Sequence, residues 1–307
     1  MKTKSKSIIR SACHSSGVVV FAGAVLLIAS GAQAQNLFVT GWSSGSIHEY
    51  TPGGGQSTFA SGIWNPAGLA FDSAGNLFVA SRGDVGTSAI YKFTPGGVQS
   101  TFASGLDFLQ GMAFDSAGNL FVAGWSSSIY EFTPGGVQST FVSGLAQPFQ
   151  LAFNSAGDLF VSDPVAGSIH EFTPGGVQST FATGLNNPNG LAFNSAGMLF
   201  ESDYGSGNIY EYTPGGGRST FASGLANPYG MAFDSAGNLF VGDQGSGNIY
   251  EYTPGGGRST FASGLGYDVW DLAFQDETLP VPEPSALGLL AVGAAALLVH
   301  RRRNLAA

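Results

Sequence analysis

Residues 68–79 read Gly68-Leu69-Ala70-Phe71-Asp72-Ser73-Ala74-Gly75-Asn76-Leu77-Phe78-Val79, which is two short apolar stretches joined by a tight polar turn. The Asp side chain can cap that turn, and the Gly can supply the positive φ angle that a short hairpin needs. Near-copies of the hairpin begin at Gly111, Gln150, Gly190 and Gly230. A split sixth copy takes its halves from residues 271–274 and 36–39, so one unit repeats along most of the chain.

The repeat unit predicts four short strands. Leu-Phe pairs recur from Leu37 to Leu239 at spacings of 40, 43, 39, 40 and 40 residues. In the second unit we expect strands at 68–72, 76–80, 89–94 and 98–103. The first two are apolar on both faces, which is typical of a sheet covered on both sides. The sequence Thr-Pro-Gly-Gly between the third and fourth strands predicts a type II turn.

These units predict an all-β fold, a six-bladed β-propeller of four-stranded antiparallel blades. The first strand type occurs six times, but the chain opens with the second type and ends with a lone copy of the first. We therefore expect residues 271–275 to pair with residues 36–40 and close the ring, since closure removes unpaired edges.

Charge argues against nucleic acid as a partner. The formal net charge of the whole chain is −9, but residues 36–279 hold 19 acidic and four basic residues, a charge of −15. Phosphate binding needs clustered Lys and Arg. The single cysteine, Cys13, lies near the N-terminus, so disulfide chemistry is not expected in the mature chain.

The N-terminus has the three parts of a secretory signal peptide. Lys2, Lys4, Lys6 and Arg10 precede an apolar run, and Ala32-Gln33-Ala34 follows it. This predicts Sec-type export and cleavage by signal peptidase after Ala34, with residues 1–34 removed. An uncleaved membrane anchor is the alternative.

The C-terminus resembles the PEP-CTERM sorting tail of exported Gram-negative proteins. Pro282-Glu283-Pro284 precedes an apolar stretch at 286–299 and then Arg301-Arg302-Arg303. The resemblance implies processing by an exosortase-type membrane protease. We expect a linker at 277–284 and a transmembrane helix with a basic end at 285–303, with the arginines holding that end in the cytoplasm. A permanent anchor is the alternative to processing; with processing, the protein would be anchored transiently and then reach the cell surface or the exterior.

Residues 36–276 resemble NHL-type propeller repeats, which are related to gluconolactonase-like propellers. The motif is clear in Asn227-Pro228-Tyr229-Gly230-Met231-Ala232-Phe233-Asp234 and in the following Gly237-Asn238-Leu239-Phe240-Val241. The resemblance implies the fold, whereas function within such propellers ranges from binding scaffolds to lactonases and lyases.

Comparison of the units predicts a binding site at one face of the ring. The loops after each second and each fourth strand share that face, and there the units differ most and are rich in aromatic residues. The expected ligand-binding residues are Trp42, Arg82, Gln110, Trp125, Phe149, Asn189, Tyr204, Tyr229 and Trp270. A glycan or another neutral surface polymer fits such a site. Ordinary drift of loop sequences is the alternative interpretation.

Asp163, Asp203 and Asp243 end the second strand in three successive units. Two interpretations stay open for them. They converge on the channel and bind a hard cation such as Ca²⁺, or each caps its own turn.

The sequence therefore predicts an exported propeller that acts as a binding or structural scaffold, with a polysaccharide or a surface protein as its partner. The alternative is a metal-dependent enzyme of the lactonase or lyase type, for which Glu201, Asn189, Asp203 and Asp271 are candidates without a recognisable motif. A third hypothesis is a purely structural matrix protein that binds no small ligand.

Overall fold

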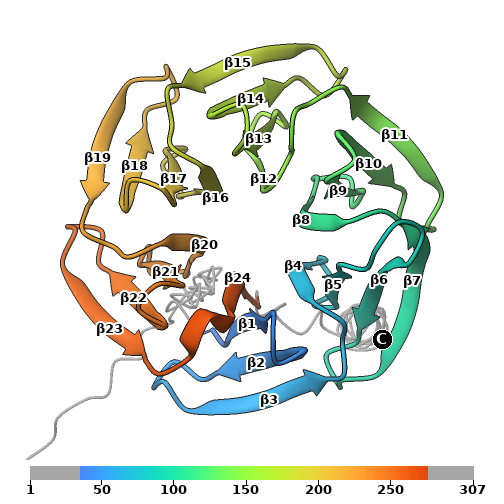
Figure 1. Cartoon of the computed structure of the whole chain (residues 1–307), viewed down its shortest axis with the longest axis horizontal. Helices are drawn as coiled ribbons and strands as arrows, with labels where there is room; N and C mark the ends of the chain where they lie inside the picture. Colours follow the sequence, from blue (N-terminus) through green and yellow to red (C-terminus); the bar gives the residue numbers. More distant parts are fainter. Residues whose placement is uncertain (1–34, 276–307) are drawn as a thin grey trace, which may run out of the picture. The chain divides into compact units, whose positions relative to one another are not determined.

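The computed structural model describes residues 35–275, which form a ring of six four-stranded sheets around a central axis (Figure 1). All strand pairs within the sheets are antiparallel, as the repeat predicts. In each blade the first strand lies nearest the axis and the fourth forms the outer edge. The prediction of six blades is confirmed.

The blades are numbered by the order in which their second strands occur. Blade 1 holds β24 (Val269–Phe274), β1 (Leu37–Gly41), β2 (Ser46–Tyr50) and β3 (Gln56–Ser61). Blade 2 holds β4 (Pro66–Phe71), β5 (Leu77–Ser81), β6 (Ser88–Phe93) and β7 (Gln99–Leu106). Blade 3 holds β8 (Leu109–Phe114), β9 (Leu120–Gly124), β10 (Ser128–Phe132) and β11 (Gln138–Ser143).

The second half of the ring repeats this arrangement. Blade 4 holds β12 (Leu151–Phe153), β13 (Leu159–Asp163), β14 (Ser168–Phe172) and β15 (Gln178–Thr183). Blade 5 holds β16 (Pro188–Phe193), β17 (Leu199–Asp203), β18 (Asn208–Tyr212) and β19 (Arg218–Ala222). Blade 6 holds β20 (Pro228–Phe233), β21 (Leu239–Asp243), β22 (Asn248–Tyr252) and β23 (Arg258–Ala262).

The last strand closes the ring, as the split copy predicts. β24 pairs with β1 in antiparallel register, with Leu37 opposite Phe274 and Val39 opposite Leu272. Blade 1 therefore joins the two ends of the described chain, and β1 has a neighbour on both sides. No strand edge is left free at the join.

The core consists of apolar clusters between neighbouring blades. Each cluster combines side chains of two consecutive blades, and one of them joins blade 6 to blade 1. The Phe of each second strand packs edge to face on two others. Phe240, for example, lies 5.0 Å from Phe261 of its own blade and 5.0 Å from Phe274 of blade 1, measured between ring centroids. Such pairs stabilise by more than their buried area alone.

The turns between first and second strands have the expected chemistry. The Asp72 carboxylate accepts hydrogen bonds from the backbone N–H groups of Ala74 (3.0 Å) and Asn76 (2.8 Å), and Gly75 has a φ of 75°. Asp115, Asn154, Asn194 and Asp234 accept the same pair of bonds in their units.

The predicted type II turn between the third and fourth strands is wrong. Such a turn requires a positive φ at its third residue, Gly53, but the positive φ of 78° belongs to Gly54. Gly54 donates its N–H to the carbonyl of Thr51, and Thr51 donates to the carbonyl of Gly55. This is the pattern of a type I turn followed by a left-handed residue in a bulge. The second Gly is therefore the one whose conformation the hairpin requires.

The predicted signal peptide, Pro-Glu-Pro motif and transmembrane helix lie outside the described residues. Between residues 35 and 275 there is no helix that is long and apolar enough to span a membrane.

Candidate functional site: the mouth of the ring

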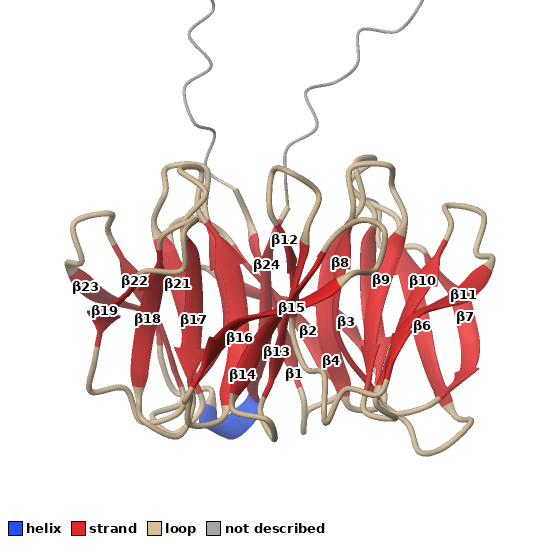
Figure 2. Ribbon diagram, turned by 90° about the horizontal axis from the view of Figure 1, so that it is seen from above, coloured by secondary structure: helices blue, strands red, loops and turns tan. Residues whose placement is uncertain are grey.

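One face of the ring carries the loops that join second to third strands and the loops that join one blade to the next; the short helix η1 (Gly266–Asp268) marks it in Figure 2. Both sets of loops line a depression of about 350 Å³, which we call the mouth hollow. Its lining residues are Arg82, Trp125, Gln147, Phe149, Pro164, Val165, Asn187, Asn189, Tyr204, Tyr229, Gln244 and Trp270. The volume is within the range of small-ligand sites.

All nine side chains expected at this face lie in or beside the mouth hollow. Seven of them line it, and the other two contact its lining residues. Trp42 stacks on Trp270 at 4.2 Å between ring centroids, and Gln110 is buried next to Arg82. The expected set lacks five other lining residues: Gln147, Pro164, Val165, Asn187 and Gln244. Gln147 and Asn187 lie two positions before the expected Phe149 and Asn189, and Pro164 and Gln244 directly follow Asp163 and Asp243, so comparing whole loops rather than single positions would have found them.

The aromatic side chains form one connected group. Trp270 contacts Tyr229 at 4.6 Å, and Tyr229 contacts Phe149 at 5.3 Å and Tyr204 at 5.8 Å, between ring centroids. Tyr229 and Phe149 are buried, whereas Tyr204, Trp270 and Trp42 are half-buried. Trp125 is 41% exposed. The mouth hollow therefore has a rigid aromatic floor and ring faces that solvent can reach.

Arg82 is the cation of this group. Its guanidinium carbon lies 3.9 Å from the centroid of the Trp125 ring and 5.3 Å from that of Trp42. With the Gln110 amide oxygen turned toward it, Nε donates at 3.3 Å and Nη1 at 3.2 Å. Burial lowers the pKa of Arg82 to about 10, which leaves it cationic at neutral pH. The two indoles and the amide hold the charge in one position.

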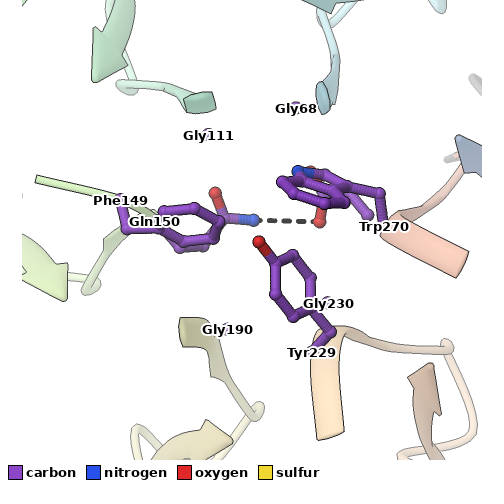
Figure 3. A pocket seen from close by; sticks show the side chains of 9 residues that line it. Gly68, Gly111, Phe149, Gln150, Gly190, Tyr229, Gly230 and Trp270 are labelled. Carbon is purple, nitrogen blue, oxygen red and sulfur yellow. Dashed lines mark hydrogen bonds between the residues drawn. The ribbon is translucent and has the colours of Figure 1, made fainter. Parts of the chain in front are cut away.

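The floor of the mouth hollow closes the propeller axis (Figure 3). The first strands bring six equivalent residues to the axis, and four of them are glycines: Gly68, Gly111, Gly190 and Gly230. The other two are Gln150 of blade 4 and Asp271 of blade 1, on opposite sides of the ring. Gln150 Nε2 donates to Asp271 Oδ1 at 3.0 Å across the axis. The remaining space of about 10 Å³ is no larger than one water.

The glycines let the strands approach closely enough for this bridge. A Cβ atom on Gly230 would lie 2.6 Å from the carbonyl oxygen of Trp270 and 2.7 Å from Cα of Asp271. Gln150 was not among the expected site residues, although it stands where four of the other hairpins have glycine, which was a visible signal. The choice of its partner depends on ring closure, which brings residues 121 positions apart into contact.

The raised pKa of the buried Asp271 predicts that the stability of the propeller depends on pH. Burial is the main cause that raises its pKa from 3.8 to about 7, and hydrogen bonds from Leu69, Leu272 and Gln150 oppose that rise. Between these two values the folded chain holds a proton that the unfolded chain has lost. We expect Asp271 to make the free energy of unfolding fall as pH rises from about 4 to about 7, by at most ~1.4 kcal/mol per pH unit. Urea unfolding at several pH values should show a smaller decline for Asp271→Asn, and an equal decline would contradict the assignment.

The structure does not bring Asp163, Asp203 and Asp243 together as a calcium site. Each is almost fully buried and accepts backbone N–H groups of the loop that joins the preceding blade to its own. Asp163 accepts from Ala146 at 2.9 Å and Ala166 at 3.0 Å, and Asp203 makes the equivalent bonds to Asn186 and Ser206. Asp243 accepts from the backbone of Ala226 and Asn227 and from the Ser246 hydroxyl. Within residues 35–275 no group of three or more His, Cys, Asp or Glu side chains is placed to hold a metal ion. Of the two interpretations, the geometry fits capping of the loops.

The other enzyme candidates are also separated. Asp271 is committed to the axis, and Asn189 lines the mouth hollow. Glu201 is fully buried, and neither carboxylate oxygen has a hydrogen-bond partner among the described residues. Burial raises the pKa of Glu201 well above its usual value, the Asp203 carboxylate raises it further, and Arg218 opposes the shift.

Family comparisons agree with the fold and the tail. Residues 97–131 match a family described as a beta-propeller repeat, and residues 280–303 match the PEP-CTERM protein-sorting motif. By its structure the chain is a six-bladed β-propeller, and its C-terminal residues match a PEP-CTERM sorting motif. Such a motif implies export and processing by an exosortase, a membrane protease, before surface display. The narrower assignment to NHL repeats stays a prediction.

Solved structures resemble this propeller in fold. The nidogen/laminin complex matches with a TM-score of 0.71 and 19% identity, covering 78% of this chain and 98% of that one. A streptogramin B lyase matches with a TM-score of 0.62 and 14% identity over 78% and 87% of the two chains. A gluconolactonase from Xanthomonas campestris matches with a TM-score of 0.57 and 22% identity over 66% and 76%. Identities this low carry the fold alone. No curated protein matches in sequence.

Proposed function

We propose that this PEP-CTERM propeller is a surface-displayed binding protein that holds a glycan in the mouth hollow. The observation that carries the proposal is the gathering of Trp42, Trp125, Tyr204 and Trp270 around one depression, with polar amides between them. The units are otherwise similar in sequence, so the loops of this face are where the six blades differ most from one another.

The chemistry of the mouth hollow suits a saccharide. Sugar rings present apolar C–H faces that stack on aromatic rings, and their hydroxyl groups bond to amides. Tyr204 and Trp125 offer accessible ring faces, while Asn187 and Gln147 offer exposed or half-buried amides. Gln244 is 6% exposed, and its Nε2 has no hydrogen-bond partner within the described chain. Because Nε2 is itself buried, the Gln244 amide would have to turn toward the mouth hollow before a ligand hydroxyl could accept from it.

A second depression extends the surface available to a polymer. It has a volume of about 440 Å³ and is lined by Val85, Asp107, Phe108, Trp125 and Ser126. Trp125 lines both depressions, so its indole would form the ridge between two adjacent binding positions. A chain of several sugar units would contact both.

The sorting route supports the location. In this proposal signal peptidase cuts after Ala34 during Sec-type export, and a helix at 285–303 anchors the chain in the inner membrane. An exosortase then recognises Pro282-Glu283-Pro284 and processes the tail, after which the propeller reaches the cell surface or the exterior. The propeller would meet polysaccharides or surface proteins there.

A glycan array probed with the purified full-length chain tests the function. We expect at least one class of glycan to bind, and Trp125→Ala to weaken that binding about tenfold or more, because stacking area is lost. Trp64→Ala is the matched control, since Trp64 is 72% exposed and lies outside the mouth hollow. Equal binding by the wild type and Trp125→Ala would contradict the proposed site, and a chain that binds no glycan would contradict the function.

A further inference from the structure

Arg82 has no acidic partner within the described chain. Residues 35–275 contain four basic side chains, of which Lys92 pairs with Asp72 at 3.4 Å. Arg218 and Arg258 also lack a carboxylate within 4.0 Å among the described residues, but they are exposed, unlike Arg82, and stack on Tyr210 and Tyr250. No carboxylate of residues 35–275 lies within 4.0 Å of the Arg82 guanidinium. A half-buried cation without a counter-ion is unusual in a region with 17 acidic and four basic residues.

The surroundings of Arg82 hold its charge without neutralising it. Trp42 and Trp125 contact the guanidinium, and the Gln110 oxygen accepts hydrogen bonds from Nε and Nη1. Within residues 35–275 the Arg82 side chain makes hydrogen bonds through Nε and Nη1, and Nη2 has no hydrogen-bond partner there. The guanidinium therefore keeps donors free at the wall of the mouth hollow.

Two carboxylates of this face, Asp271 and Asp107, are already hydrogen-bonded, and Asp84, two residues after Arg82, is exposed and lies more than 4.0 Å from the guanidinium. Asp271 bonds to Gln150 and to the backbone N–H of Leu69. Asp107 accepts the N–H of Gly86 at 2.6 Å. The side chains that line the mouth hollow include no Asp or Glu, so Arg82 gives the mouth hollow a single positive charge.

We propose that the ligand of the mouth hollow is an acidic saccharide whose carboxylate pairs with Arg82. This inference rests on the proposed glycan-binding function. The planar guanidinium matches a carboxylate, and one cation balances one negative charge, as in a uronic acid unit. The exposed parts of the half-buried Tyr204 and Trp270 rings would contact the sugar. The described region is acidic overall, but solvent ions screen charges farther than about 8 Å away at physiological salt. The attraction between Arg82 and the carboxylate of the ligand is therefore local.

The test compares acidic oligosaccharides with their own methyl esters, which keep the sugar and remove the charge. The probes are oligomers of galacturonate, glucuronate and mannuronate, titrated calorimetrically into the purified full-length chain. At least one acid is expected to bind about tenfold or more tightly than its ester, because a charge-assisted hydrogen bond is lost in the ester. Added salt should weaken binding of the acid more than binding of the ester.

Two variants separate the role of Arg82 from general effects of charge. Arg82→Gln should reduce the difference between acid and ester to about twofold or less. Arg258→Gln removes one positive charge where β23 begins, away from the mouth hollow, and should keep the full difference. Arg82→Lys should keep a preference for the acid, since the charge remains. The ester comparison on the wild type is informative even if a variant does not fold.

The failures are distinguishable. Equal binding of every acid and its ester, or binding of neutral glycans only, would overturn the inference and leave the glycan-binding function intact. Absence of binding to acidic and neutral glycans alike would overturn both. Binding of a short aspartate-rich peptide without binding of any saccharide would also overturn both, because the mouth hollow would then recognise protein.

Discussion

Replacing Glu201 with valine is expected to stabilise the propeller. The third residue of each second strand is a buried valine in five blades (Val39, Val79, Val122, Val161 and Val241) and Glu201 in blade 5. At the equivalent place in blade 6, Val241 packs with Phe200, Ile209 and Leu225. A carboxyl group in such a position, with both oxygens unpartnered, costs about 1–3 kcal/mol when neutral and on the order of 3–5 kcal/mol when charged.

The advantage of Glu201→Val should widen with pH. Because the pKa of Glu201 is raised in the folded chain, the folded chain keeps a proton that the unfolded chain releases above its ordinary value of 4.5. The free energy of unfolding of the wild type therefore falls as pH rises from about 4.5 to the raised pKa of folded Glu201. The valine variant has no Glu201 to titrate, so its free energy of unfolding lacks this pH-dependent loss. Denaturant unfolding at pH 5 and pH 8 measures both effects. The matched control is Val241→Glu, which should lose what Glu201→Val gains, and a valine variant less stable than the wild type at pH 8 would contradict the account.

Removal of β24 is expected to abolish cooperative folding. A chain that ends at Asp268 lacks Val269 and Leu272, which are buried between blades 6 and 1, and leaves β1 with an unpaired edge. It also lacks Asp271, which bridges the axis. Each buried aliphatic side chain contributes about 1.5–3 kcal/mol, and a whole domain has only about 5–15 kcal/mol of net stability.

The control for this truncation is a chain that ends at Gln275 and keeps β24. We expect it to melt cooperatively, with the circular dichroism of a folded β protein, whereas the shorter chain aggregates or shows no transition. Equal melting temperatures would show that closure through β24 is dispensable, against the topology described here.

Repetition explains why the fold could be predicted so far. The constant distance of 30 residues from each third-strand isoleucine to the next Leu-Phe pair, as from Ile47 to Leu77, fixed the unit. The lone residues 271–275 then required pairing with residues 36–40. The turn between third and fourth strands was predicted incorrectly, because Pro-Gly-Gly is compatible with a positive φ at either glycine. Only the hydrogen bonds of the hairpin decide between them.

The sequence was enough to predict which residues lie at the site. It was not enough to predict how their side chains contact one another. Loop variability placed Trp42, Arg82 and Trp125 on one face, but the packing of the guanidinium against two indoles depends on rotamers. The bridge from Gln150 to Asp271 depends on the width of the axis, which the glycines set. Glu201 was visible as the one acidic residue at a valine position, and its burial without a partner became evident only from the packing of blades 4 and 5.

A crystal structure of the propeller with a bound oligosaccharide from the array would test the central claim most directly. The account predicts electron density for the sugar in the mouth hollow, against Tyr204 and Trp270 and within hydrogen-bond distance of Arg82. Density at the depression of about 410 Å³ beside Lys92 and Pro134, among the turns of blades 2 and 3 on the opposite face, would contradict it.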